Sequence, residues 1–194
     1  MNKKPKLLPF MVDYIKSFEG WRKKAYLDSA NVWTIGWGTT KWFDGSNIKE
    51  GMVITKEIGN KLFNRDINNF SSKIFDFVKV KLSDHQFSSL VSFTYNVGIG
   101  NFSRSTLLKK LNKGMYKEAA AEFSKWVKVR NRKTNKWTVL KGLVLRRKKE
   151  MKVFLTPDTI KISEFRNFVD NIKARGYTFI YKNKFNILEV KERQ

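Results

Sequence analysis

The chain has 194 residues, of which 41% are hydrophobic and three are proline, so it can bury a core as one globular domain with or without an appendage. The absence of cysteine excludes disulfides, thiolate metal sites and a cysteine nucleophile, and no run of about 18 apolar residues suggests a transmembrane helix. A formal charge of +23 should attract polyanions, but it does not choose among nucleic acid, anionic lipid and acidic cell-wall polymer.

The first predicted elements are a short helix and a hairpin. Residues Pro9–Phe18 place apolar side chains at helical spacing, and Gly20 is a plausible stop, so Glu19 is expected at the end of this helix. Residues Ala25–Thr40 are rich in aromatic and β-branched side chains, with turn-forming residues at Asp28–Asn31. This pattern predicts a small two-stranded sheet.

Two longer helices are predicted next. Thr55 precedes a periodic segment that extends to about Phe77, which is long enough to bridge two lobes. Ser83 and Gln86 have the spacing of a capping box, and the apolar run that follows them should form a largely buried helix ending at Gly98.

Shorter helices are predicted next, at about Ser105–Leu111, Met115–Val127 and Gly142–Leu155. The segment Lys128–Thr138 between them is interpreted as a polar, basic and mobile loop. Sixteen basic and three acidic residues lie between Lys109 and Lys152, which indicates either a solvated helical surface or a face that binds polyanions.

A separate set of secondary-structure elements is predicted after Pro157. Residues Ile162–Ala174 are predicted to form a helix, and Tyr177–Tyr181 and Phe185–Val190 are predicted to form two strands. We therefore interpret residues 157–194 as an appendage of one helix and one hairpin. It could serve as a packing or capping element or as a binding element.

Several kinds of catalytic site are excluded by the residues that are missing. His85 is the only histidine, so zinc sites of the H-E-x-x-H type and sites with several histidines cannot form. Gly36-Trp37-Gly38 is not followed by the Lys-Ser/Thr pair of a phosphate-binding loop. No metal or cofactor is expected. The remaining candidates for catalysis are carboxylate side chains.

Glu19 is the best candidate for a carboxylic acid that acts as a proton donor. The negative end of the helix dipole and the neighbouring Phe18 and Trp21 should both disfavour the ionised form. Asp28 and Thr34 follow in the predicted hairpin, so the helix end and the hairpin could form two walls of a cleft. Taken alone, a glutamate and an aspartate at this spacing are more often a surface acid and a turn residue.

The surrounding motifs favour the catalytic interpretation of Glu19 and Asp28, because they resemble motifs of the phage lysozymes of glycoside hydrolase family 24. The resemblance covers about residues 9–156 in the order and spacing of that family. The segments that carry it are Phe18-Glu19-Gly20, Ala25-Tyr26-Leu27-Asp28, Trp33-Thr34-Ile35-Gly36-Trp37-Gly38, Lys61–Asp66, Gln86–Gly98 and Gly142–Arg147.

The resemblance implies an α+β, mainly helical, two-lobed lysozyme-like fold with a small N-terminal β-hairpin sheet. Within a catalytic domain of residues 1–156, it places the active-site lobe at about 9–54, the inter-lobe helix at about 55–77 and the helical lobe at about 78–156. Residues 157–194 lie outside the resemblance.

The implied activity is a muramidase that cuts the β-1,4 bond between N-acetylmuramic acid and N-acetylglucosamine in peptidoglycan. By position, Glu19 becomes the general acid, Asp28 the partner carboxylate and Thr34 the hydroxyl that orients water, with inversion at the sugar. Asn96 and Arg146 fall where the family often places groups that line the cleft or support the acid, and we expect them to bind the substrate.

One position departs from the family pattern. Many members have histidine directly after the T-I-G-x-G motif, where this chain has Thr39, whereas the aspartate that pairs with that histidine is retained as Asp66. We expect the loss of this charged pair to affect stability more than catalysis.

The implied biological role is that of an endolysin that remains in the host bacterial cytoplasm until release and then acts in the periplasm or cell wall. Residues Leu7–Val12 are too short for the apolar part of a signal peptide, so release through a holin-type membrane lesion is implied. We expect a monomer that neither binds nucleic acid nor inserts stably into membranes. The alternative is a non-catalytic basic protein that binds the wall or disrupts membranes.

Overall fold

The computed structural model describes residues 4–28, 31–130, 134–157, 177–182 and 187–192. The chain divides into two compact units, Met1–Thr156 and Pro157–Gln194. Among the described residues, no helix is long and apolar enough to cross a membrane.

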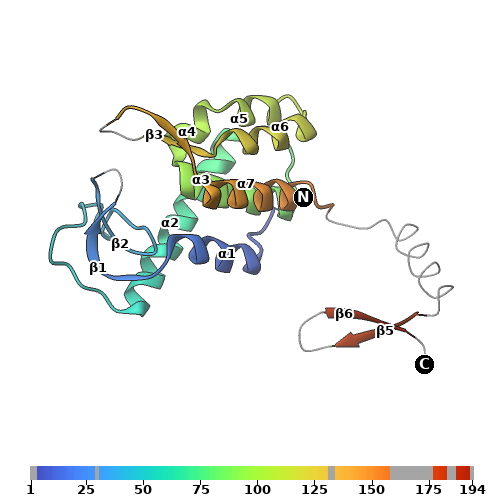
Figure 1. The fold of residues 1–194 in the computed structure, drawn as a ribbon, viewed down its shortest axis with the longest axis horizontal. Coiled ribbons are helices and arrows are strands. Elements are labelled where there is room, and N and C mark those ends of the chain that lie inside the picture. The colour runs from blue at the N-terminus through green and yellow to red at the C-terminus, as the bar shows by residue number, and fades with distance from the viewer. Residues whose placement is uncertain (1–3, 29–30, 131–133, 158–176, 183–186, 193–194) are drawn as a thin grey trace. The chain divides into compact units, whose positions relative to one another are not determined.

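The first unit is mainly helical, and Figure 1 shows its elements in the colours of chain order. Its elements are α1 (Pro9–Glu19), β1 (Arg22–Leu27), β2 (Trp33–Gly36), α2 (Lys56–Phe77), α3 (Asp84–Val97), α4 (Ile99–Arg104), α5 (Thr106–Leu111), α6 (Tyr116–Glu122), the 3-10 helix η1 (Phe123–Lys125), β3 (Lys128–Arg130), β4 (Trp137–Val139) and α7 (Lys141–Phe154).

Helix α1 ends where the sequence predicts. Pro9 occupies its first turn, where a missing N–H costs nothing, and Gly20 closes it with a φ of +68°. Met11 and Ile15 are fully buried on one face of the helix. Glu19 is therefore the last helical residue and lies beside the chain reversal that leads into β1.

The small lobe is built on the antiparallel pair β1–β2, in which Tyr26 lies opposite Thr34. Its core is small and consists of the buried side chains of Ile35, Ile48, Ile54 and Leu62, with tryptophans packed around them. A Cβ on Gly59 would lie 2.2 Å from the Trp21 ring, so only glycine lets α2 approach this lobe so closely.

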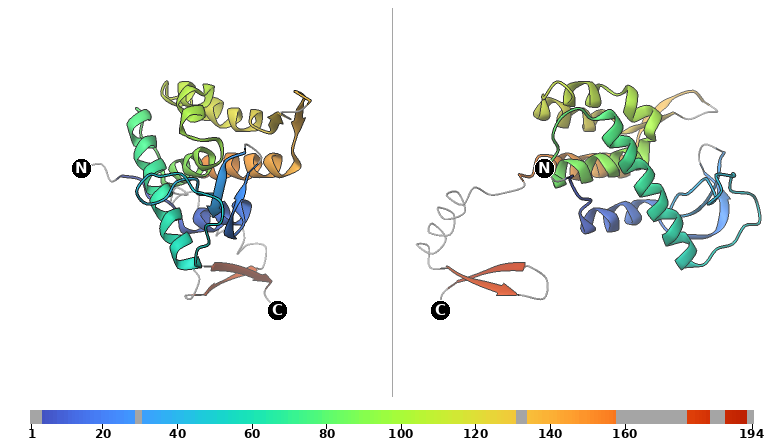
Figure 2. Two further views of the ribbon diagram at one scale, coloured as in Figure 1. Left: turned by 90° about the vertical axis from the view of Figure 1, so that its left-hand side faces the viewer. Right: turned by 180° about the vertical axis from the view of Figure 1, so that it is seen from behind.

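Helix α2 joins the two lobes, as predicted. The Thr55 side chain accepts a hydrogen bond from the Ile58 amide and caps the start of the helix. Leu62 belongs to the small core, whereas Phe63 and Ile74 belong to the larger core. Figure 2 shows this helix running from the hairpin side to the helical side of the unit.

The helical lobe is assembled around α3, whose capping box between Ser83 and Gln86 is present as predicted. Its middle is buried on all sides, and α7 packs along it. The core of this lobe contains aromatic rings from several elements, including a T-shaped pair formed by Phe93 and Phe123 at 5.2 Å between ring centroids.

Three features of this lobe differ from the prediction. Lys128–Thr138 is not simply a loop, because β3 and β4 pair there with Val129 opposite Thr138. A short helix, α4, also follows Gly98 directly, and the helix predicted at Met115–Val127 ends earlier and continues as η1. Each of these elements is too short to produce a clear periodicity.

In the second unit, β5 (Tyr177–Lys182) and β6 (Ile187–Glu192) form an antiparallel pair in which Phe179 lies opposite Val190. These strands confirm the predicted hairpin. The helix predicted at Ile162–Ala174 lies outside the described residues.

Candidate active site

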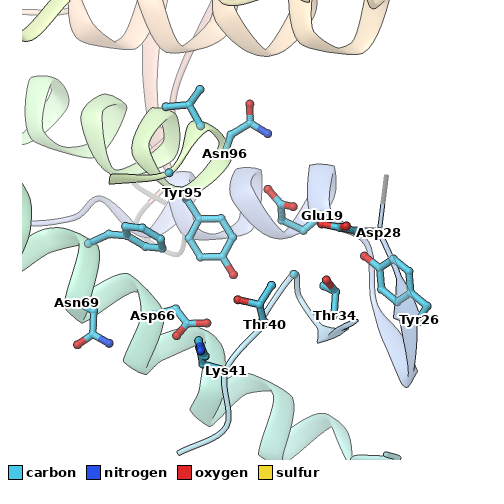
Figure 3. Close-up of a pocket in the computed structure, with 14 residues that line it drawn as sticks. Glu19, Tyr26, Asp28, Thr34, Thr40, Lys41, Asp66, Asn69, Tyr95 and Asn96 are labelled. Carbon is cyan, nitrogen blue, oxygen red and sulfur yellow. The ribbon is translucent and has the colours of Figure 1, made fainter. Parts of the chain in front are cut away.

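A cleft of about 600 Å³ lies between the end of α1, the β1–β2 hairpin, α2 and the end of α3. Figure 3 shows the side chains that face it. Glu19, Asp28 and Thr34 all line this cleft. The three positions that the sequence singles out are thus brought together in one cavity.

The backbone at Gly38 allows the hairpin side of the cleft to approach Glu19. Gly38 has a φ of +94°, and a Cβ at this position would lie 3.2 Å from Oε2 of Glu19. Any other residue would be strained there and would crowd the carboxylate. This explains why glycine at the end of the T-I-G-x-G motif suits the site.

Arg146 fixes the other oxygen of Glu19. Its Nη1 donates to Glu19 Oε1 at 2.8 Å, and its guanidinium lies 5.3 Å from the centre of the Phe18 ring. From its sequence neighbours we expected apolar surroundings for Glu19. The structure instead places a charged guanidinium against its carboxylate. Arg146 thus binds Oε1, whereas Oε2 lies on the side of the carboxylate that faces Gly38.

Arg146 is itself held by a buried carboxylate. Glu150 is fully buried, and its Oε1 accepts from Arg146 Nε at 3.2 Å and from the Ser92 hydroxyl at 2.7 Å. Its Oε2 accepts from Arg147 Nη1 at 2.6 Å. Burial raises the pKa of Glu150, and the two guanidiniums and Ser92 partly offset that effect. We name Arg146, Arg147, Glu150 and Ser92 the buried ion cluster.

Asp28 and Thr34 are held by contacts within the hairpin. Asp28 Oδ1 accepts from the Val32 amide at 2.9 Å, which closes the turn between β1 and β2. The Thr34 hydroxyl donates to the Val32 carbonyl at 3.0 Å, so its lone pairs remain available to accept a hydrogen bond. Figure 3 shows the Thr34 hydroxyl, the Asp28 carboxylate and the Glu19 carboxylate facing the same part of the cleft.

Two tyrosines add neutral hydroxyl groups to the cleft. Burial and the nearby Glu19 raise the pKa of Tyr26, and the same two causes, burial first, raise the pKa of Tyr95. The Tyr95 hydroxyl donates to the carbonyl of Trp37 at 2.7 Å and so anchors the segment that follows β2. Both side chains remain protonated at neutral pH.

Thr39 keeps the connection between the small sheet and the long helix that a histidine would make. It is buried, and its hydroxyl donates to Asp66 Oδ2 at 2.6 Å. Asp66 is also paired with Arg65 at 2.6 Å. The charged pair is absent, but a charge-assisted hydrogen bond replaces it, so the expected loss of stability is smaller than the sequence suggests.

Asn96 and Arg146, the two further predicted site residues, differ in their access to the cleft. Asn96 lines the cleft, and its Oδ1 accepts a hydrogen bond from Arg147. Arg146 is only 2% exposed and lies behind Glu19. Its geometry fits support of the acid and does not fit direct contact with a ligand.

Comparison with known proteins agrees with the sequence motifs. The family model for phage lysozymes matches residues 16–150. The chain belongs to the phage lysozyme family. It is therefore a member of a family of lysozyme-type glycoside hydrolases.

Individual relatives show how far the similarity extends. The endolysin of Acyrthosiphon pisum secondary endosymbiont phage 1 is 40% identical over 140 residues, which are 72% of this chain and 91% of that relative. The endolysin of Bacillus phage B103 is 40% identical over 154 residues, or 78% of this chain, but the chain spans only 55% of its length. The muramidase domain of SpmX from Asticaccaulis excentricus has a TM-score of 0.69 at 33% identity, with 79% of this chain and 100% of that domain covered.

Sequence reasoning missed several residues that shape this phage lysozyme cleft. Tyr26 lies in the motif Ala25-Tyr26-Leu27-Asp28, but it was not predicted to line the cleft. Glu150 follows Arg146 and Arg147 at the i+4 and i+3 spacing of helical ion pairs, which is a signal that could have identified the cluster. No local sequence pattern identifies Tyr95 as a residue of the cleft. Among the described residues, no group of three or more potential metal-binding side chains gathers.

Proposed function

We propose that this chain is a muramidase that hydrolyses the β-1,4 bond between N-acetylmuramic acid and N-acetylglucosamine in peptidoglycan. The observation that carries the proposal is the convergence of Glu19, Asp28 and Thr34 on one cleft, with Glu19 oriented by a buried arginine. Two carboxyl groups on either side of a sugar are the requirement for glycoside hydrolysis. Membership of the phage lysozyme family supports the same chemistry.

In the proposed reaction, Glu19 donates the proton on Oε2 to the glycosidic oxygen as the bond to the anomeric carbon breaks. A water molecule donates one hydrogen bond to the lone pairs of Thr34 Oγ1 and gives its other proton to Asp28. The hydroxide so formed attacks the anomeric carbon from the opposite face and inverts its configuration. Inversion requires carboxyl groups about 6.5–9.5 Å apart to admit the water.

The two tyrosines and the buried ion cluster would act by positioning. Arg146 holds Oε1 of Glu19, so the proton-bearing oxygen points toward the hairpin wall near Gly38. Tyr26, which lies opposite Thr34 in the hairpin, offers a hydroxyl beside both carboxylates. Such pre-orientation lowers the barrier because the groups need not reorganise during the reaction.

We propose the biological role of an endolysin that causes bacterial lysis. The protein would remain in the host cytoplasm as a monomer, pass through a holin-type membrane lesion and act in the periplasm or cell wall. It would need no cofactor and no nucleic acid. The charge of +23 would favour contact with acidic wall polymers.

The second candidate is a non-catalytic protein that binds walls or disrupts membranes through its basic surface. It is favoured by the many exposed cations of α7 and the β3–β4 hairpin, which include Lys128, Lys141 and Lys148. It differs from the first candidate because it does not depend on Glu19.

The decisive experiment compares the wild type with Glu19→Gln on isolated peptidoglycan and on chloroform-treated Gram-negative cells. Glutamine can keep the contact with Arg146 but cannot protonate the leaving oxygen. We expect clearing and new N-acetylmuramic acid reducing ends from the wild type alone, and a loss of about 10²–10⁴-fold in the variant. Equal clearing by both proteins would favour the second candidate. In a separate experiment, NMR of the freshly formed product would show whether the configuration of the anomeric carbon is inverted.

A further inference from the structure

A second hollow of about 920 Å³ lies on the helical lobe, outside the part of the cleft that contains the catalytic candidates. It is bordered by the end of α3, by α4, by η1, by the β3–β4 hairpin and by the start of α7. Its size is within the range of about 300–1,000 Å³ that is typical of small-molecule sites. The proposed reaction does not use any part of it except its border.

This hollow adjoins the catalytic cleft. Asn96 and Val97 line both cavities. Figure 3 shows Asn96 on the wall of the cleft that belongs to the helical lobe. A linear polymer bound across Glu19 could therefore extend past Asn96 into the second hollow without leaving the protein surface.

The lining combines tryptophan rings with neutral amide groups. Trp137 is 64% exposed, although tryptophan usually buries most of its ring. Trp126 is half-buried and is supported from behind by Phe93, at 5.4 Å between ring centroids. Asn96 and Asn101 add amide groups at the same hollow. A flat apolar ring with a polar N–H suits the apolar face of a sugar ring, and side-chain amides suit its N-acetyl groups.

The hairpin explains why Trp137 is presented in this way. Opposite residues of an antiparallel pair lie on the same face, so Trp137 shares a face with Arg130, and Val139 shares it with Lys128. All four side chains are exposed. The fold gains little from exposing Trp137 and Val139, and such exposed apolar groups beside a cavity mark a binding surface.

One acid, Glu122, partly offsets the charge of the two lysines, Lys125 and Lys128, that line the hollow. Glu122 is buried at the edge of the hollow and accepts hydrogen bonds from Lys110 at 2.5 Å and Lys125 at 2.9 Å. Lys125 is thus partly neutralised by an acid that lines the same hollow. A concave surface also suits an extended chain better than a flat lipid bilayer.

We propose that this hollow is an extension of the glycan-binding cleft, in which Trp137 stacks on N-acetylated sugar residues beyond those that flank the cleaved bond. The inference rests on the proposed function, because it takes the glycan strand as the ligand of the cleft. It assigns the β3–β4 hairpin a role in holding long strands.

The test measures binding of peptide-free glycan oligosaccharides, a tetrasaccharide and an octasaccharide, by calorimetry in the Glu19→Gln background, which prevents turnover. Trp137→Ala should weaken octasaccharide binding by about tenfold and change tetrasaccharide binding by less than about twofold. Leu145→Ala is the matched control, because Leu145 is 63% exposed on the neighbouring α7 and does not line the hollow. It should change neither affinity.

Other results would overturn the inference. An unchanged octasaccharide affinity in Trp137→Ala, or an equal loss for both oligosaccharides, would show that the hollow does not extend the cleft. Competition by a free muramyl peptide that depends on Trp137 would assign the hollow to the peptide stem. Trp137-dependent sedimentation with vesicles of phosphatidylglycerol and phosphatidylethanolamine would assign it to lipid. Failure of the proposed function appears separately, as undiminished lysis by Glu19→Gln with intact Trp137.

Discussion

The two walls of the cleft are held in place by different kinds of interaction. On the helical side, Glu19 is held by Arg146, which is 127 positions away in the sequence, and Arg146 is part of the buried ion cluster. On the hairpin side, Asp28 and Thr34 are held by hydrogen bonds to Val32, four and two positions away. Changes on the helical side should therefore affect folding and chemistry together, whereas changes in the hairpin should affect chemistry almost alone.

Asp28→Asn should give the largest effect and should separate chemistry from folding. Asparagine can still accept the hydrogen bond from the Val32 amide through its side-chain oxygen, but it cannot accept the proton from water. We expect activity on peptidoglycan to fall by about 10²–10⁴-fold, with an unfolding free energy within about 0.5 kcal/mol of the wild type. Turbidity assays and urea denaturation measure the two quantities. A fall in the unfolding free energy well beyond about 0.5 kcal/mol would contradict the inference that this wall is held only by local contacts.

Glu150→Gln should reduce both stability and activity, because it removes the buried carboxylate that pairs with the guanidiniums of Arg146 and Arg147. We expect the unfolding free energy to fall by about 3–5 kcal/mol in urea denaturation. Activity should fall as well, since Arg146 loses the partner that orients it toward Glu19. Glu118→Gln on the exposed face of α6 is the control and should be neutral. If Glu150→Gln behaved like this control, the cluster would not support the acid.

Thr39→Val tests the connection between the small sheet and α2. Valine has nearly the shape of threonine but lacks the hydroxyl that donates to Asp66. The unfolding free energy should fall by about 1–3 kcal/mol while the reaction at Glu19 continues. Thr39→His, by contrast, should raise the melting temperature at pH 5–6, where imidazole is largely protonated. The sheet would not need this connection if valine were neutral and histidine had no effect at any pH.

Glu122→Gln should have the smallest effect, and that effect should depend on pH. Hydrogen bonds from Lys110 and Lys125 lower the pKa of Glu122 from its ordinary value of 4.5. A carboxyl whose pKa is lower in the folded state stabilises the fold above its unfolded pKa and loses that contribution as pH falls. The variant should melt about 2–4 °C lower at pH 7, and the difference should shrink below about pH 4. A difference that stays constant from pH 7 to pH 3 would show that the charge of Glu122 is irrelevant.

The sequence predicted most helix boundaries of the first unit, because the signals at those boundaries are local. Thr55, Ser83 and Gln86 each act within four residues of the helix that they cap, and Gly20 terminates α1 through its own backbone conformation. The strands β3 and β4 were missed because their side chains are exposed and show no alternation of buried and exposed positions. Without a buried face, the hydrophobic pattern contains no information on pairing.

The candidate site was predicted in part for the same reason. Glu19, Asp28 and Thr34 lie within 16 consecutive residues, so one short motif contains the proposed acid and the proposed water-binding groups. Tyr95 was not predicted, because its hydrogen bond runs from α3 to the segment after β2. Glu150 was not predicted, because it reaches the cleft only through Arg146, which contacts Glu19 across 127 positions. The role of Glu150 stays a prediction that Glu150→Gln tests.

The sequence by itself determined the chemical groups of the cleft and the local turns that present them, because short-range hydrogen bonds and glycine conformations depend on neighbouring residues. Only the tertiary structure decided that Arg146 contacts Glu19 directly and that a second cavity adjoins the cleft at Asn96. Both depend on helices that are far apart in the chain and pack together to bury a common core, so no local pattern encodes them.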